Sequence, residues 1–248
     1  MNPAEFATIA RSEQNFWWYR GMRRILFRLL DDEARGREIA RVLEAGCGTG
    51  HLALEIERRY GWSMIPLDLA WEGLRHGRRL GAARLVQGDI AALPFARESF
   101  DAVISMDVIV HFPRGQESEP VAEFARVLRP NGLLVLRVSA LDMLRSRHSE
   151  FAHELQRFTR GRLRELAESQ GFRVVRCTYL NSLLMPVALA KFRIWEPLTR
   201  QPPASGVVPV PGWLDAMLYA PLALEARWLG VGGGFPLGQS LALVAEKA

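Results

Sequence analysis

The middle of the chain, from about residue 41 to 180, alternates short apolar runs with helical patterns. The apolar runs predict strands over residues 41–45, 63–67, 84–87, 102–106, 133–138 and 173–179. The spacing of apolar residues between them predicts helices over about 51–60, 71–80, 120–129 and 160–170. Gly171 marks a helix end, and Pro130-Asn131-Gly132 predicts a turn before the fifth strand. Strands that alternate with helices indicate βαβ units and an α/β fold with a doubly wound, mainly parallel sheet.

Residues 1–40 show a helical pattern. Apolar residues recur at i, i+3, i+4, i+7 and i+8, which is one face of a helix: Met22, Ile25, Leu26, Leu29 and Leu30. Just before them stands the run Phe16-Trp17-Trp18-Tyr19, four aromatic residues that a single helical face cannot bury together.

The alternating rhythm stops in residues 181–239. An apolar stretch over 183–195 precedes a proline-rich connection, a second helical pattern over 213–229 that contains Pro221, and a Gly232-Gly233-Gly234 hinge. Residues 240–245 predict a final strand. Neither helix of 181–239 can bury its apolar face alone, so we expect an insertion rather than an independent domain. One domain over 1–248 is expected.

The composition is that of an ordinary globular protein. The chain has 248 residues, 49% of them hydrophobic and 24% charged, which excludes wholesale disorder, collagen and coiled coil. Only Cys47 and Cys177 are present, without a CxxC pair, so a disulfide scaffold is not expected and a reducing compartment fits. Without a secretion signal or an apolar run of about 18 residues, a cytoplasmic protein with no stable membrane insertion is expected.

The net charge of +5 does not by itself indicate a nucleic-acid partner. Of the 32 basic residues only Lys191 and Lys247 are lysine, and the arginines are scattered among 27 acids in short clusters. This pattern is typical of a solvated surface rather than of a groove for nucleic acid. No nucleic acid is expected as a partner.

A glycine-rich turn after the first predicted strand carries the most chemical information. The segment 42–50 runs from a strand that ends near Glu44 through Gly46-x-Gly48-x-Gly50 into a helix that begins near His51. Glycines permit positive φ angles, and the helix N-terminus offers free N–H groups to an anionic ligand. Dinucleotide sites prefer G-x-G-x-x-G, but His51 stands at the last of those positions. The second strand ends at Asp68, an acid that can bind ribose hydroxyls.

Four segments together resemble the class I S-adenosylmethionine-dependent methyltransferases of the small-molecule, type 11-like kind. They are LEAGCGTG (43–50), IPLDLA (65–70), QGDIAALPFARESFDAVISMDVIVHF (87–112) and RVLRPNGLLVLRV (126–138). FWWYRGMRRIL (16–26), NSLLMP (181–186) and GQSLALVAEK (238–247) are similar to one subset of the family. The resemblance implies a seven-stranded sheet of order 3-2-1-4-5-7-6 with the last strand antiparallel. It also implies a helical lid over 1–40, a cofactor-binding core over 41–180, a substrate cap over 181–239 and a last strand over 240–248.

The resemblance also assigns residues to S-adenosylmethionine as cofactor. The glycines would shape the loop around its methionine and ribose, Glu44 would orient that loop, and Asp68 would bind the ribose hydroxyls. Leu69, Asp89 and Ile90 would meet the adenine, and the Met106 carbonyl would meet the ammonium. The residues implied to hold the cofactor are Arg20, Glu44, Gly46, Cys47, Gly48, Gly50, Asp68, Leu69, Asp89, Ile90 and Met106. Cys47 is interpreted as a small loop residue and not as a nucleophile.

Histidines after the strands are the candidates for acid–base chemistry. His111 follows the fourth strand, where a base or substrate ligand and a simple packing residue are equally good interpretations. His148 and His153 follow the fifth strand, where ordinary loop residues are the favoured alternative. Tyr19 and Arg20 lie where the N-terminal segment would fold over the cofactor, and Arg20 suits the methionine carboxylate. No metal is expected, because no acidic pair accompanies the histidines at ligand spacing.

The acceptor is expected to be a small molecule, apolar or aromatic, because tryptophans crowd the insertion. The sequence thus predicts O-methylation of such a molecule in secondary-metabolite or glycan biosynthesis, with N- or C-methylation left open. An RNA or protein methyltransferase, and a protein that keeps the fold without methylating, are the alternatives. The sequence carries no signal for the oligomeric state.

Overall fold

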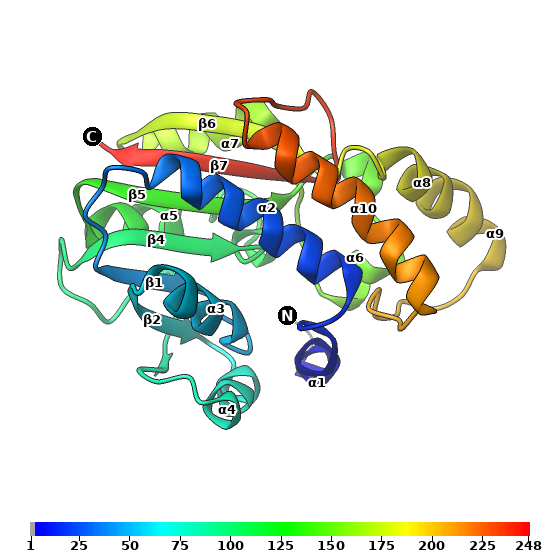
Figure 1. The fold of residues 1–248 in the computed structure, drawn as a ribbon, viewed down its shortest axis with the longest axis horizontal. Helices are drawn as coiled ribbons and strands as arrows, with labels where there is room; N and C mark the ends of the chain where they lie inside the picture. Colours follow the sequence, from blue (N-terminus) through cyan, green and yellow to red (C-terminus); the bar gives the residue numbers. More distant parts are fainter. Residues whose placement is uncertain (1–2) are drawn as a thin grey trace.

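A seven-stranded sheet forms the centre of the computed structural model, which describes residues 3–248 (Figure 1). The strands are β1 Arg41–Ala45, β2 Ser63–Asp68, β3 Val86–Gln87, β4 Phe100–Met106, β5 Leu128–Ser139, β6 Phe172–Leu180 and β7 Ser240–Lys247. Their order is β3-β2-β1-β4-β5-β7-β6. β1 to β5 pair in parallel, and β7 is antiparallel to both β5 and β6. The predicted fold class and strand order are confirmed.

Helices cover both faces of the sheet (Figure 1). Their bounds are α1 Pro3–Ser12, α2 Trp17–Glu33, α3 His51–Tyr60, α4 Trp71–Leu80, α5 Ser118–Val127, α6 Arg147–Phe151, α7 Arg160–Ser169, α8 Met185–Ala190, α9 Glu196–Thr199 and α10 Gly212–Leu229. Short 3-10 turns occupy Ile109–His111 and Asp142–Leu144. None of the described helices is long and apolar enough to cross a bilayer.

Each face of the sheet has its own hydrophobic core. Phe124 of α5 and Leu163 of α7 pack on one face. Leu26 of α2 and Ile56 of α3 pack on the other, and the rest of α2 packs against α10 through residues such as Leu222. The helical pattern read in residues 1–40 is thus present. α2 packs into the cores of the fold, and α1 and the start of α2 are the parts of this segment that lie at the site described below.

Three elements differ from the sequence prediction. The third strand starts at Val86 and not at residue 84, because Arg84 has a φ of 54°, which is incompatible with an extended strand. The turn predicted at Pro130-Asn131-Gly132 lies inside β5, where Asn131 has a φ of 61° and the register with β4 shifts.

The apolar stretch predicted over 183–195 is not one regular helix. α8 passes into a π-helical turn over Lys191–Trp195 and then into α9. Pro197 lies in the first turn of α9 and has no N–H with which to continue the preceding helical ladder.

Candidate active site

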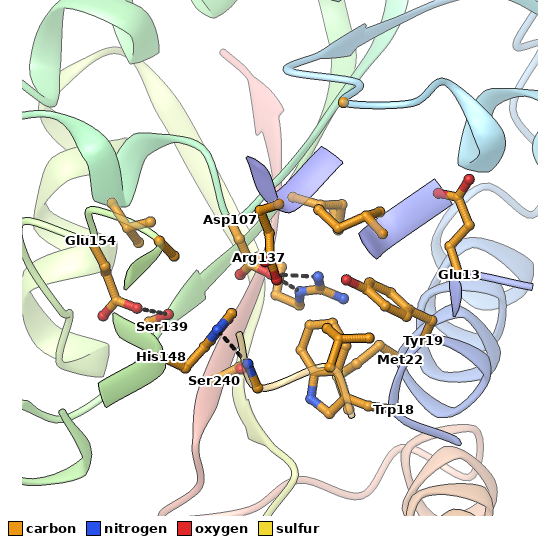
Figure 2. Close-up of a pocket in the computed structure, with 18 of the residues that line it drawn as sticks. Glu13, Trp18, Tyr19, Met22, Asp107, Arg137, Ser139, His148, Glu154 and Ser240 are labelled. Atoms are coloured by element: carbon orange, nitrogen blue, oxygen red, sulfur yellow. Dashed lines mark hydrogen bonds and ion pairs between the residues drawn. The ribbon is translucent and has the colours of Figure 1, made fainter. Parts of the chain in front are cut away.

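A cavity of about 450 Å³ lies at the carboxyl ends of β1, β4 and β5 and at the start of β7. This is the edge where ligands bind in open α/β sheets. α1, the start of α2, the loop over 204–207 and the segment that follows β5 complete its walls. Figure 2 shows part of the lining.

The glycine turn forms one wall of this cavity. Gly46, Gly48 and Gly50 all have positive φ, between 57° and 83°. A Cβ on Gly46 would lie 2.3 Å from the side chain of Val108, so the loop needs glycine there for close packing as well as for conformation. The Gly48 N–H donates to Oδ2 of Asp68 at 2.7 Å. The predicted loop and the predicted acid are therefore in direct contact.

Several carboxyl side chains of the lining have a buried oxygen without a hydrogen-bond donor. They include Glu44 at the end of β1, Glu13 between α1 and α2, and Asp107 after β4. Burial raises the pKa of Glu44 well above its ordinary value and raises the pKa of Glu13 to about 7. Unpaired buried acceptors are costly, so a ligand that brings donors or positive charge is favoured at this wall. The ammonium of S-adenosylmethionine has this chemistry, and the residues present fit that end of the cofactor.

The residues predicted for the nucleoside lie outside the lining of the cavity. Leu69 and Asp89 are exposed, whereas Ile90 is buried. Asp68 is partly buried and uses its second oxygen to accept from the Ala70 N–H at 2.8 Å. α1 lies beside this region, because the buried ring of Phe6 comes near Gly48 and contacts the α4 backbone.

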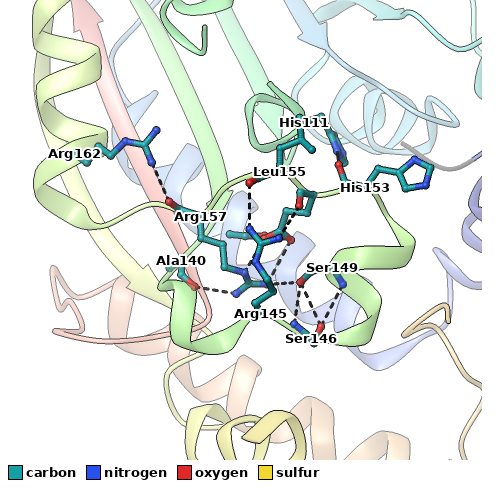
Figure 3. Close-up of polar contacts among 11 residues, drawn as sticks. His111, Ala140, Arg145, Ser146, Ser149, His153, Leu155, Arg157 and Arg162 are labelled. Atoms are coloured by element: carbon teal, nitrogen blue, oxygen red, sulfur yellow. Dashed lines mark hydrogen bonds and ion pairs between the residues drawn. The ribbon is translucent and has the colours of Figure 1, made fainter. Parts of the chain in front are cut away.

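The histidines after the strands have different hydrogen bonds, although His111 and His148 both line the cavity. Nδ1 of His111 lies 3.0 Å from the carbonyl oxygen of His153, so Nδ1 must carry the proton, and Nε2 keeps a free lone pair (Figure 3). Nδ1 of His148 accepts from the Gly206 N–H at 2.9 Å, which leaves Nε2 of the neutral ring as a donor. Burial lowers the pKa of both rings, so both are neutral at pH 7. The side chain of His153 is exposed and does not line the cavity.

An ion pair and two aromatic rings lie between the histidines and the glycine turn. Nε of Arg137 in β5 donates to Oδ2 of Asp107 at 3.0 Å, and its guanidinium lies 4.9 Å from the centre of the Trp18 ring (Figure 2). Tyr19 lines the same space, and burial raises the pKa of its phenol, which therefore stays protonated. Protonated Tyr19 is a donor and not a base.

Arg20 points away from the cavity. Its guanidinium forms an ion pair with Asp215 of α10 at 3.2 Å and lies 4.4 Å from the centre of the Tyr219 ring. Of the other predicted residues, Met106 and Cys47 line the cavity, and Gly50 lies in the turn but not in the lining. Among the described residues, no cluster of three or more His, Cys, Asp or Glu side chains is arranged to hold a metal ion.

Several lining residues were not predicted from the sequence. Glu13 meets the Thr49 hydroxyl, Glu154 accepts from Ser139 at 3.1 Å and pairs with Arg157, and Asp107 holds Arg137. Asp107 follows the fourth predicted strand directly, and Arg137 is a lone charge in the apolar fifth strand; both features are readable in the sequence. Glu13 has no such signal, because only the chain path brings it to the glycine turn.

Comparisons with known proteins agree with this site. A model of the methyltransferase domain family matches residues 42–132, the segment that holds the glycine turn, Asp68 and Asp89. Malonyl-[acyl-carrier protein] O-methyltransferase of Enterobacter lignolyticus is 39% identical over 44% of this chain and 42% of its own length. A probable S-adenosylmethionine-dependent methyltransferase of Mycolicibacterium smegmatis is 31% identical over 66% of this chain and 62% of its own length. The chain thus spans less than two thirds of the length of these curated relatives.

The solved structures show the same fold. A putative sarcosine dimethylglycine methyltransferase from Galdieria sulphuraria superposes with a TM-score of 0.59 at 18% identity, covering 92% of this chain and 86% of the other. The family match lies on the half of the sheet that forms the glycine turn, and the strand order expected for that family extends through β7. Residues 42–132 therefore match the methyltransferase domain family, and the strand order of the whole sheet is the one expected for class I S-adenosylmethionine-dependent methyltransferases.

Proposed function

We propose that this protein transfers a methyl group from S-adenosylmethionine to an oxygen of a small-molecule acceptor. The observation that carries the proposal is the cavity at the glycine turn, which places carboxylates without donors on one wall and a neutral His111 with a free Nε2 on another. When bound, S-adenosylmethionine supplies a methyl group that is already activated on a sulfonium.

The chain's own task is then to bind the cofactor and the acceptor, to orient them toward each other and to exclude water. Glu44 would hold the cofactor's ammonium end, and Gly46, Cys47, Gly48 and the end of β4 at Met106, which line the cavity with it, would surround that end. Asp68 offers its carboxylate to ribose hydroxyls beside the Gly48 amide that it already holds. Leu69, Asp89 and Ile90 are assigned to the adenine.

His111 acts as the general base in this proposal. Its Nδ1–H is held by the His153 carbonyl, which orients the ring and leaves Nε2 to accept the proton of an acceptor hydroxyl. His148 donates a hydrogen bond from Nε2, and Tyr19 donates from its phenol. Both donors position the acceptor.

The acceptor is proposed to be a small molecule with an apolar or aromatic part, in secondary-metabolite or glycan biosynthesis. Trp17, Trp18, Phe16 and Phe192 contribute aromatic surface to the cavity lining, which suits such a group. O-methylation is favoured because a base of this type serves a hydroxyl or carboxyl acceptor, and because one relative is an O-methyltransferase by name.

Binding and turnover are tested separately. Calorimetry with S-adenosylmethionine, S-adenosylhomocysteine and a nicotinamide dinucleotide should show binding of the first two only. Release of S-adenosylhomocysteine is then followed with panels of phenols, carboxylic acids and amines. Binding of the dinucleotide alone would overturn the cofactor assignment, and turnover with amines only would overturn the O-methylation.

A further inference from the structure

Exposed apolar side chains are concentrated in the insertion, residues 181–239. Twelve of the eighteen large hydrophobic side chains that are exposed among the described residues belong to this segment, although it makes up less than a quarter of the chain. α8 and α9 lie at one end of the molecule, away from the C-terminus, and α10 runs from that end back alongside α2 (Figure 1). Monomeric proteins rarely expose apolar surface at such density without a partner.

The outer face of α10 is a continuous apolar stripe. Its exposed residues follow one another at intervals of four, seven and four, which places them on one side of a helix: Trp213, Met217, Leu224 and Trp228. The opposite side packs against α2 through Leu222, Ala226 and Leu229. α10 is therefore apolar on both sides, and the core uses only one of them.

The segment from α8 to α9 repeats this arrangement. Val187, Ile194, Trp195 and Leu198 are each more than half exposed and recur at intervals of seven, one and three. The proline-rich connection to α10 adds Val208, which is 59% exposed. Three tryptophans, one in this segment and two in α10, are thus each more than half exposed.

In the insertion the acidic side chains face the body of the protein and the basic side chains face the solvent. Its three acids are held inward: Glu196 accepts from the Arg147 N–H at 2.9 Å, Asp215 from the Trp17 N–H at 2.8 Å and Glu225 from the Leu183 N–H at 2.7 Å. Its four cations are exposed, and none of them forms an ion pair among the described residues. Arg193, Arg200 and Arg227 lie outside the cavity lining, whereas Lys191 lines the cavity. The outer surface of the insertion is therefore apolar and positively charged.

We propose that this outer surface docks on a lipid bilayer that contains anionic phospholipids. Exposed tryptophans and aliphatic side chains partition into the interfacial region of a bilayer, and lysine or arginine side chains beside them bind anionic headgroups. The contact is peripheral, with the helices lying on the membrane.

The charge pattern favours an anionic bilayer, rather than a second copy of the chain, as the partner of this outer surface. Pairing two copies through this face would bring cations against cations without an acid to compensate them, and such juxtaposition is unfavourable. An anionic bilayer instead complements both the cations and the apolar stripes.

The same segment forms part of the cavity wall. Phe192, Glu196 and residues 204–207 line the cavity, so a docked insertion places this wall close to the lipid surface. An apolar acceptor would then be taken from the membrane. This last step rests on the proposed function, whereas the docking itself requires neither cofactor nor turnover.

The test measures binding of the full chain to vesicles by co-sedimentation. Vesicles of phosphatidylcholine alone are compared with vesicles that also contain phosphatidylglycerol. We expect the wild type to prefer the anionic vesicles by at least about tenfold, and high salt to abolish the preference. The double variant Arg193→Glu with Arg227→Glu, both outside the cavity lining, should weaken binding by roughly 25-fold or more, since each cation contributes about fivefold.

The apolar part is tested with Trp213→Ser combined with Trp228→Ser, which should weaken binding to anionic vesicles by at least about tenfold. Brominated lipids should quench the tryptophan fluorescence of the wild type more than that of this variant. Matched controls are Arg78→Glu with Arg79→Glu on α4 for charge and Val175→Ser on β6 for exposed apolar surface. Thermal unfolding verifies that each variant is folded.

Three outcomes overturn the proposal. The first is equal or no binding of the wild type to the two kinds of vesicle. The second is binding that the insertion variants and the controls reduce alike. The third is a dimer in sedimentation that the tryptophan variant dissociates while no vesicle is bound. Loss of vesicle binding with unchanged affinity for S-adenosylmethionine would separate this proposal from that of the activity.

Discussion

Asp68 holds the glycine turn with one carboxylate oxygen and its own loop with the other. A carboxylate fixed in this way is pre-oriented, and its remaining lone pairs can accept from ribose hydroxyls. The same side chain would therefore both hold the glycine turn and bind the ribose of the cofactor.

We expect Asp68→Ala to weaken the affinity for S-adenosylmethionine by at least about tenfold, because charge-assisted hydrogen bonds are lost. Calorimetry measures the dissociation constant. Asp68→Asn is the matched control, since an amide oxygen can still accept from the Gly48 N–H and should retain the loop. An unchanged dissociation constant in a folded Asp68→Ala protein would remove the ribose role.

The structure predicts that the His111 ring is neutral, and the pH dependence of the reaction rate can test this. Burial lowers the pKa of its imidazole below the ordinary 6.5, so the ring stays neutral to more acidic pH and can accept a proton there. The reaction rate should fall only when the pH drops through this lowered pKa.

Replacing His111 with Gln should reduce kcat by about 100-fold or more, without changing the affinity for S-adenosylmethionine, and should remove the acidic limb of the pH–rate profile. His76→Gln on α4, outside the cavity, is the control. A wild-type rate and profile in His111→Gln would leave the residue with a packing role only.

The buried carboxyl of Glu13 makes the free energy of unfolding depend on pH. Burial raises the pKa of its carboxyl from 4.5 to about 7 in the folded chain, and the unfolded chain keeps the ordinary value. Between these two pH values the unfolded state releases its proton first, so the free energy of unfolding decreases as the pH rises through this window.

We therefore expect Glu13→Gln, which can still accept from Thr49, to be more stable than the wild type by about 2 to 3 kcal/mol near pH 8 without cofactor. Near pH 4, where the wild-type carboxyl is protonated in both states, the difference should vanish. Denaturant unfolding at several pH values measures both. Equal pH dependence of the two proteins would contradict the burial of this carboxyl.

At the scale of elements, α1 is placed as a cover for the glycine turn. Phe6 is buried beside Gly48 and the α4 backbone, and Glu5, Ile9 and Glu13 line the cavity. α2 differs from α1, because its apolar face belongs to the cores. We therefore expect α1 to act as the lid, and we expect a deletion that reaches into α2 to unfold the protein.

A point substitution tests the lid without this damage. Phe6→Ala should increase the dissociation rate of S-adenosylmethionine by roughly tenfold, because α1 loses its buried anchor. Arg11→Ala on the same helix, at an exposed position, should leave the rate unchanged. Stopped-flow fluorescence measures the rate, and an identical rate in Phe6→Ala and the wild type would contradict the lid.

At the scale of the whole molecule, the N-terminal segment and the insertion share one core. α2 and α10 are separated by about 180 residues in the chain, yet Gly21 packs against Leu222 so closely that an added Cβ would lie 2.2 Å from its Cδ1. Asp215 accepts from the N-terminus of α2, and Arg28 donates to the Gly230 carbonyl at 2.8 Å. We therefore expect the insertion to unfold together with the rest of the chain in one cooperative transition.

This coupling predicts opposite effects for two helical glycines. Gly21→Ala should destabilise the whole protein by about 1 to 3 kcal/mol through overpacking, despite the better helix propensity of alanine. Gly161→Ala in α7, where nothing lies within 4 Å of an added Cβ, should be neutral or stabilising by up to about 1 kcal/mol. Chemical denaturation measures both. A neutral Gly21→Ala, or two separate unfolding transitions, would contradict the shared core.

The sequence by itself determined the order of elements, the sheet and the cofactor edge. Local signals suffice for these: apolar runs buried between two helical layers, glycines at positive φ and an acid at or near the end of each of the first four strands are all readable within a few residues. The left-handed backbone of Arg84 escaped prediction because arginine has no preference for that conformation, whereas Asn131, a residue type that tolerates it, lies at the predicted turn.

Only the tertiary structure decided which side chains share the cavity. Arg20 was expected at the cofactor, but the path of α10 brings Asp215 and Tyr219 to it instead. The roles of His111 and His148 depend on whether a carbonyl or an N–H meets Nδ1, and that partner comes from residue 153 in one case and 206 in the other. Contacts between residues so far apart in the chain arise from packing as a whole, and no local pattern of amino acids records them.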